Sequence, residues 1–194
     1  MKDRLCLLFC DYFQAEVEWL LKSQNYAGIK VLFYQANCDK TQQSAQVLDF
    51  ITQCTQSARV IIFAGACLQY QLQKITQIDF QIEPLEICFE LLLPPAQLQQ
   101  VLAVGGHLLT NGMLKHWEKV KQNWGFSAQA QKDFFAETTC KLVFLSHPEI
   151  PIDEIALDTV ATEFGLPLER LEITLEPLAL RILTVINQWH SKRI

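Results

Sequence analysis

The stretch Arg59-Val60-Ile61-Ile62-Phe63-Ala64-Gly65-Ala66-Cys67 decides the fold, because it is an apolar run that ends in a turn and a cysteine. Continuous apolar runs of this kind are typical of strands with both faces covered, as in parallel sheets. Two other runs, Leu5–Cys10 and Lys30–Cys38, have the same character and also end at a cysteine. Stretches of helical periodicity separate the runs, and this alternation predicts βαβ units with parallel strands.

The periodicity continues along the whole chain. Strands are expected at residues 5–10, 29–35, 59–64, 80–82, 107–109, 141–145 and 171–175. Helices are expected at residues 12–23, 41–54, 68–75, 88–93, 96–104, 113–124, 127–139, 153–164 and 177–189. We therefore predict an α/β fold with mostly parallel sheet flanked by helices, Rossmann-like. Residues 1–194 would form a single domain, with two possible βαβαβ halves at about 1–94 and 95–194.

Composition restricts the class of protein. Half of the 194 residues are hydrophobic and 19% are charged, which is typical of a chain with a large buried core. The net charge is −5 without a lysine or arginine cluster, so we expect no nucleic-acid partner. The longest apolar run, Val60–Leu68, is too short to span a bilayer. The seven cysteines follow no short regular spacing, which favours reduced thiols and a cytoplasmic location.

Four cysteines carry the clearest chemical signal. Cys10, Cys38 and Cys67 end predicted strands, and Cys88 opens the segment after the weak fourth strand. Parallel strands end at one edge of a sheet, where ligands of open α/β folds bind. Four thiolates make a complete shell for zinc or for an iron–sulfur cluster. The sequence therefore predicts a metal site at Cys10, Cys38, Cys67 and Cys88, with Glu16 as an orienting group or additional ligand.

Cysteines also have simpler roles. Unmodified cysteine is among the most buried residue types and packs as a small hydrophobe. We expect this of Cys6, Cys54 and Cys140, and the same explanation stays open for the other four. A redox pair or a nucleophile is a further alternative, in which His107 or His116 would serve as the neighbouring base.

The turn Thr110-Asn111-Gly112 follows a predicted strand and opens a predicted helix. Backbone N–H groups at such a point can hold an anionic group of a cofactor or substrate. Neither a GxGxxG nor a Walker pattern is present in the sequence. The alternative is a tight turn in which Asn111 is the N-cap.

The cysteine motifs resemble those of an uncharacterised prokaryotic family, the domain of unknown function 1638. Cys10-Asp11-Tyr12-Phe13-Gln14-Ala15-Glu16 is similar to its strand-ending C-x5-E motif. Asn37-Cys38-Asp39 is similar to its second turn, and Ala64-Gly65-Ala66-Cys67 to its Tyr-Gly-x-Cys turn. Ile87-Cys88-Phe89-Glu90-Leu91-Leu92-Leu93 is similar to its Asp-Cys pair followed by leucines. Leu109-Thr110-Asn111-Gly112-Met113 is similar to its Leu-Thr-x-Gly-Trp strand end, so the resemblance covers nearly the whole chain.

The chain departs from that family pattern at three positions, where Cys38 replaces His, Ile87 replaces Asp and Met113 replaces Trp. Exchanging His for Cys keeps a zinc ligand and turns a Cys₃His set into Cys₄. The same exchange would remove a general base. Loss of the Asp argues against acid–base catalysis there. The stretches Trp117–Phe135 and Pro177–Leu183 resemble versions that precede signalling modules, which implies a signalling partner.

Three functions stay open on this basis. The first is a non-catalytic sensor or carrier domain that binds a metal or small molecule through the four cysteines. The second is a metal-dependent enzyme that acts on a small anionic substrate at the same edge. The third is a structural or interaction domain whose cysteines only pack, and the oligomeric state stays open in all three.

Overall fold

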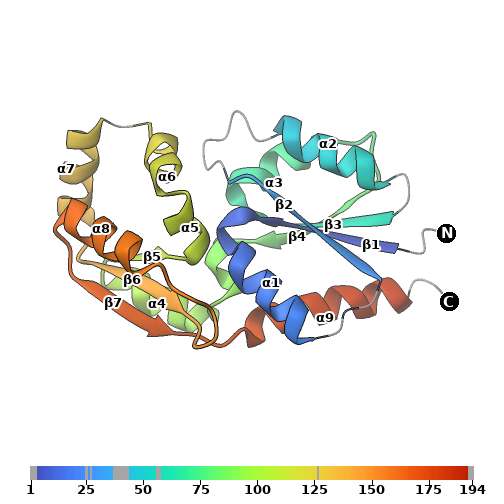
Figure 1. Ribbon diagram of the computed structural model, residues 1–194. Helices are drawn as coiled ribbons and strands as arrows, with labels where there is room; N and C mark the ends of the chain where they lie inside the picture. The colour runs from blue at the N-terminus through green and yellow to red at the C-terminus, as the bar shows by residue number, and fades with distance from the viewer. Residues whose placement is uncertain are drawn as a thin grey trace.

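The computed structural model describes residues 4–24, 26, 28–36, 44–55, 58–125 and 127–191. In these residues seven strands form two parallel sheets, ordered β2-β1-β3-β4 and β5-β6-β7 (Figure 1). The strands are β1 (Arg4–Cys10), β2 (Ile29–Tyr34), β3 (Ala58–Gly65), β4 (Gln81–Leu85), β5 (Gly106–Leu109), β6 (Lys141–Ser146) and β7 (Leu168–Glu172). The predicted α/β fold with parallel sheet is confirmed.

Helices cover both sheets. Figure 1 shows α2 and α3 over one face of the first sheet and α1 and α9 over the other. The helices are α1 (Gln14–Ser23), α2 (Ser44–Thr55), α3 (Ala66–Leu72), α4 (Pro95–Ala103), α5 (Asn111–Lys115), α6 (Trp117–Asn123), α7 (Ala128–Thr138), α8 (Glu154–Phe164) and α9 (Glu176–Ser191). Two short 3₁₀ helices, η1 (Asp11–Phe13) and η2 (Cys88–Leu91), follow β1 and β4. None of the described helices is both long and apolar enough to cross a membrane.

Strand β1 is central to the first sheet. It pairs with β2 on one side and β3 on the other, and residues 5–9 are fully buried. Both faces of the strand are therefore covered, which explains why the sequence shows a continuous apolar run instead of alternation. Phe9 stacks on Phe63 of β3, with ring centroids 4.3 Å apart.

The last helix returns to the first sheet. The chain leaves β7 in the second sheet, and α9 then packs under the first (Figure 1). Arg181 of α9 reaches Glu83 of β4 at 3.5 Å and Glu90 of η2 at 3.0 Å. The chain therefore crosses between the two sheets a second time, so the second half of the sequence also covers the first sheet.

The two sheets meet where α5 contacts the backbone of η1. The Thr110 hydroxyl donates to the carbonyl oxygen of Tyr12 at 2.6 Å, across 98 residues of sequence. A Cβ on Gly112 would lie 2.4 Å from the carbonyl oxygen of Asp11 and 2.5 Å from that of Tyr12. This approach is too close for any side chain at Gly112, which explains the glycine.

Several element boundaries differ from the sequence prediction. The helix predicted at 113–124 is two helices, because the backbone leaves helical geometry at His116. The residues predicted as helix 88–93 form only the short η2. The last strand is Leu168–Glu172, because Ile173 and Leu175, which looked like strand residues, are buried in the connection to α9. Thr110, not Asn111, is the N-cap of α5 and accepts from the backbone N–H of Met113.

We predict that Gly112→Ala destabilises the protein by about 2–3 kcal/mol, because the new methyl group would force two carbonyl groups of η1 away from α5. Urea unfolding followed by circular dichroism would measure this change in the free energy of unfolding. Lys115→Ala, an exposed position on the same short helix, is the matched control and should change it by less than about 0.5 kcal/mol. Equal effects of the two substitutions would contradict the close contact.

Candidate functional site

Three of the four predicted cysteines line one cavity of about 270 Å³, which we call the thiol cavity. Cys10 is the last residue of β1, Cys67 lies at the start of α3 after β3, and Cys88 begins η2 after β4. The cavity therefore lies at the carboxyl ends of neighbouring parallel strands, where the fold class places ligand sites. Its walls are largely aromatic and come from Tyr12, Phe13, Tyr34 and Phe89.

The thiols of Cys67 and Cys88 both lie close to Gly65, on the side where a Cβ would project. A Cβ on Gly65 would lie 2.1 Å from the sulfur of Cys88 and 3.8 Å from that of Cys67. The absence of a side chain at Gly65 therefore lets the two thiols approach one strand end. Cys38, the fourth predicted ligand, lies outside the described residues. Ala36, two positions earlier, lines the cavity.

Burial controls the protonation of Cys10. Desolvation raises the pKa of this thiol well above its usual value, and the nearby charges of Asp11 and Cys67 raise it further. A hydrogen bond from the backbone N–H of Tyr12 opposes the shift but does not reverse it. Cys10 is therefore a neutral thiol at physiological pH, and it becomes a thiolate only if a cation binds beside it.

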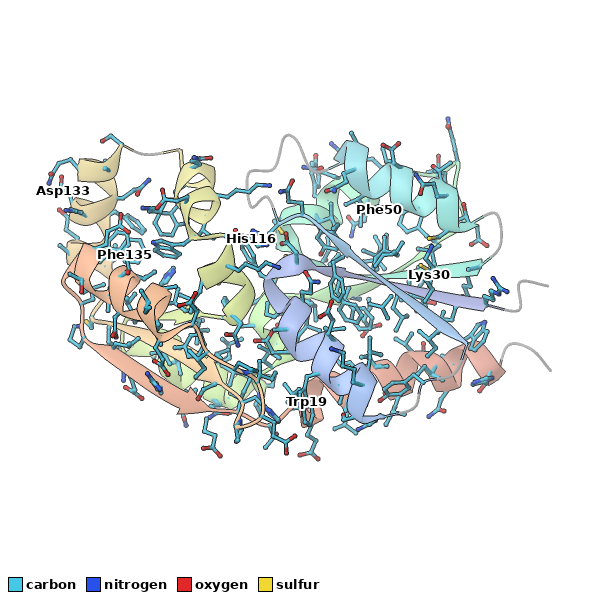
Figure 2. The ribbon with its side chains drawn as sticks, in the orientation of Figure 1. Trp19, Lys30, Phe50, His116, Asp133 and Phe135 are labelled. Carbon is cyan, nitrogen blue, oxygen red and sulfur yellow. The ribbon has the colours of Figure 1, made fainter. Side chains whose placement is uncertain are left out.

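The two histidines considered as bases do not line the thiol cavity. His107 lies in the second sheet, with its ring centroid 4.8 Å from that of Phe135 and 6.1 Å from that of Trp124. Burial lowers the pKa of His107 to about 4, so this imidazole is neutral. His116 lies between the two sheets (Figure 2), with Nε2 3.9 Å from Oδ2 of Asp11.

The strand ends around the thiol cavity are held together by side chains. Oδ1 of Asp11 accepts a hydrogen bond from the backbone N–H of Ala36 at 2.8 Å, which joins the ends of β1 and β2. The side-chain amide of Gln69 donates to the carbonyl oxygens of Ala64 and Leu85, both at 2.7 Å, which joins β3 and β4. These bonds fix the positions from which the three cysteines project.

The three thiols line one cavity but do not form a ready metal site. Among the residues that the structure describes, no group of three or more His, Cys, Asp or Glu side chains is already arranged to hold a metal ion. A single zinc ion needs sulfurs at about 2.3 Å from one centre. Binding one zinc ion would therefore require the thiols to move together, whereas a larger centre would occupy the cavity between them.

A second cavity, of about 510 Å³, lies on the other side of the contact between α5 and η1. Asn111 and Gly112 of the predicted anion-binding turn line it, together with Lys115. Thr110, the first residue of that turn, is fully buried, and its hydroxyl is occupied by the bond to the Tyr12 carbonyl. The turn thus joins the two sheets and exposes only its last two residues to a cavity, and anion binding there stays a prediction.

Glu16 of α1 is a buried carboxylate next to the same contact. Its exposed fraction is 1%, and within the described part of the chain neither oxygen has a hydrogen bond of normal geometry. Burial raises the pKa of Glu16 to about 7, although the side chain and backbone of Asn111 lie close enough to oppose the shift. Glu16 does not line the thiol cavity, so its role as a further ligand stays a prediction.

The remaining described cysteines divide into two kinds. Cys6 and Cys54 are buried, as expected for core residues. The expectation for Cys140 was wrong, because this residue is exposed in the turn before β6. The turn passes close to Gly105, whose backbone would place a Cβ 3.0 Å from the Cys140 sulfur.

Sequence reasoning missed several residues of the thiol cavity. Tyr34 and Met113 were not predicted as site residues, yet both line the cavity, and Met113 comes from the part of the chain that forms the second sheet. Glu86 adds a carboxylate to the wall one position before Ile87. Glu86 lies two positions before Cys88, and because Glu83 and Glu90 flank it in the sequence, no local signal distinguished it.

The comparisons with known proteins found no match. No family model matches the chain, and neither a curated protein nor a solved structure is similar to it. The resemblance to the domain of unknown function 1638 therefore stays a prediction based on the short motifs.

We predict that the free energy of unfolding decreases between about pH 5 and pH 8 because of Glu16. Its folded pKa of about 7 lies above the value of 4.5 for an exposed glutamate, so the folded state binds the proton more tightly. Stability is therefore lost as the pH rises through this interval, by about 2–3 kcal/mol in total. Glu16→Gln should remove most of this loss.

Urea unfolding of both proteins at pH 5 and pH 8 would measure the effect. The matched control is Glu18→Gln, at the next glutamate of the same helix, whose side chain is half-exposed. This variant should keep the pH dependence of the original chain. An unchanged pH dependence in Glu16→Gln would contradict the buried, unpaired carboxylate.

Proposed function

We propose that this protein binds a metal centre in the thiol cavity, through Cys10, Cys67 and Cys88 with Cys38 as the fourth ligand. The observation that supports the proposal is that three thiols from three separate strand ends line one cavity. Core packing alone does not require cysteines from three separate parts of the chain to line a single cavity. Thiolates are preferred ligands of zinc and of iron–sulfur clusters.

The shape of the cavity favours a centre of several atoms. The thiols line a cavity of about 270 Å³, and an iron–sulfur cluster separates its ligating sulfurs more widely than one zinc ion does. The aromatic wall suits a cluster as well, because low solvent exposure is one of the factors that sets its reduction potential. Zinc is the alternative centre.

The protein would then act as a sensor or carrier. A four-cysteine shell leaves no open position for substrate on a zinc ion, which favours a non-catalytic role. Binding would release thiol protons, because Cys10 is a neutral thiol without a cation beside it. A reducing compartment such as the cytoplasm would keep the thiols available, and a signalling partner would read the bound state.

A metal-dependent enzyme is the second candidate, and the second cavity favours it. Asn111, Gly112 and Lys115 line this cavity, which lies across the α5 contact from the thiols. A small anionic substrate would place its negative group near the lysine and the amide, away from the carboxylates of Asp11, Glu18 and Asp153 that also line the cavity. This reading requires a centre with an open position and therefore only three protein ligands.

We predict that protein purified without oxygen carries either iron with sulfide or zinc. A cluster would show broad absorbance near about 400 nm and roughly four irons per chain, whereas zinc would be colourless at roughly one per chain. Metal analysis and an ultraviolet–visible spectrum would distinguish the two. Less than about half an equivalent of any transition metal would contradict the proposal.

Variants test which thiols bind the centre. Cys67→Ser and Cys38→Ser should each lower the metal content at least about tenfold, since each removes a ligand. Cys140→Ser, at an exposed thiol outside the cavity, is the matched control and should keep full metal content. Circular dichroism would show that each variant is folded. If Cys67→Ser loses the metal and Cys38→Ser keeps its full metal content, the centre has three cysteine ligands, which would support the enzyme.

A further inference from the structure

A second pair of thiols lies in the core, apart from the thiol cavity. Cys6 of β1 and Cys54 of α2 are 48 residues apart in sequence, yet their sulfurs lie 3.2 Å apart. The S–H of Cys6 donates to the sulfur of Cys54. A disulfide joins its sulfurs at about 2.0 Å, so a movement of roughly 1 Å would bring this pair to bonding distance.

We propose that Cys6 and Cys54 form an oxidisable dithiol, which a small disulfide of the glutathione class converts into an intramolecular disulfide. The product would tie α2 to β1, the central strand of the first sheet. Because the pair shares no residue with the thiol cavity, the proposal does not depend on the metal centre.

Cys54 is the residue at which the reaction begins. It lies near the end of α2, and its exposed fraction is 4%, against 0% for Cys6. Local opening at a helix end costs less than opening of a central strand, so Cys54 is the sulfur that a reagent can reach first. The S–H of Cys6 points at the sulfur of Cys54, so the two sulfurs already face each other.

The reaction has two exchange steps. The Cys54 thiolate attacks one sulfur of the small disulfide, which forms a mixed disulfide and expels the first small thiolate. Cys6 then loses its proton and attacks the Cys54 sulfur, which breaks the mixed disulfide and expels the second small thiolate. The protein loses two electrons and two protons, and the small disulfide is reduced to two small thiols.

The environment of Cys6 makes disulfide formation slow. Burial, together with the neighbouring Cys54, raises the pKa of Cys6 to about 12, although the charge of Lys30 opposes the shift. Few Cys6 thiolates therefore exist at neutral pH, and thiolate is the form that reacts. The disulfide should therefore form under prolonged oxidising conditions and not during brief ones.

Oxidation would stabilise the fold. The cross-link would close a loop of 48 residues that runs from β1 through α1 and β2 to α2. Closing a loop reduces the conformational freedom of the unfolded chain, which raises the free energy of unfolding. The urea midpoint of the oxidised protein should therefore lie above that of the reduced protein.

The experiment treats the full reduced chain with oxidised glutathione under native conditions. The remaining thiols are then alkylated. Mass spectrometry measures the mass of the intact chain, and peptide mapping locates the cross-link. We expect a species that carries two fewer alkyl groups than the alkylated reduced chain, with the cross-link mapped to Cys6 and Cys54. Cys140→Ala, at an exposed thiol, is the matched control and should form the same cross-link. Cys54→Ala should not form it.

The peptide map of the unsubstituted chain decides the question even if a core variant fails to fold. The proposal is wrong if the folded protein forms its first disulfide between cysteines of the thiol cavity, or if it only accumulates mixed disulfides with glutathione. It is also wrong if the Cys6–Cys54 link forms only when urea is present. Metal content measured on the same samples reports separately on the thiol cavity.

Discussion

The contact between α5 and the backbone of η1 is the interaction on which the arrangement of both cavities depends. One buried hydroxyl, that of Thr110, begins α5 by accepting from Met113 and joins the two sheets by donating to Tyr12. A buried hydrogen bond contributes about 1 kcal/mol, but its removal would leave a carbonyl and an amide without partners, at a cost of about 1–3 kcal/mol. Gly112 makes the approach possible, because any side chain there would collide with η1.

This contact separates two chemical environments. On one side, Met113 completes an aromatic, thiol-lined wall, and desolvation keeps the thiol of Cys10 neutral. On the other side, Asn111 and Lys115 line a cavity with charged walls. Residues of one short helix therefore line both cavities. A ligand that moved α5 in one cavity would also change the shape of the other. The buried carboxylate of Glu16, against Asn111, makes the same junction sensitive to pH.

Much of this could be predicted from the sequence, because periodicity reports burial. The runs that end at Cys10 and Cys67 were assigned to strands, and their parallel pairing places both thiols at one edge. The rest depends on contacts between distant segments, which no local pattern encodes. The return of α9 to the first sheet buries its apolar face and pairs Arg181 with two glutamates, and the approach of Met113 to the thiols depends on Gly112. The apolar pattern also misplaced β7, because Ile173 is buried without being in a strand.

Strand β1 shows how position along one element selects the chemistry of a thiol. Cys6 and Cys10 are four residues apart, so the strand period of two places them on the same face. Cys6 lies under α2, where the nearest reactive group is another sulfur, whereas Cys10 ends the strand at the wall of a cavity. Burial raises the pKa of both thiols, so neither is reactive alone. The partner then determines the reaction: a cation can draw the proton from Cys10, and Cys6 can react only with the sulfur beside it.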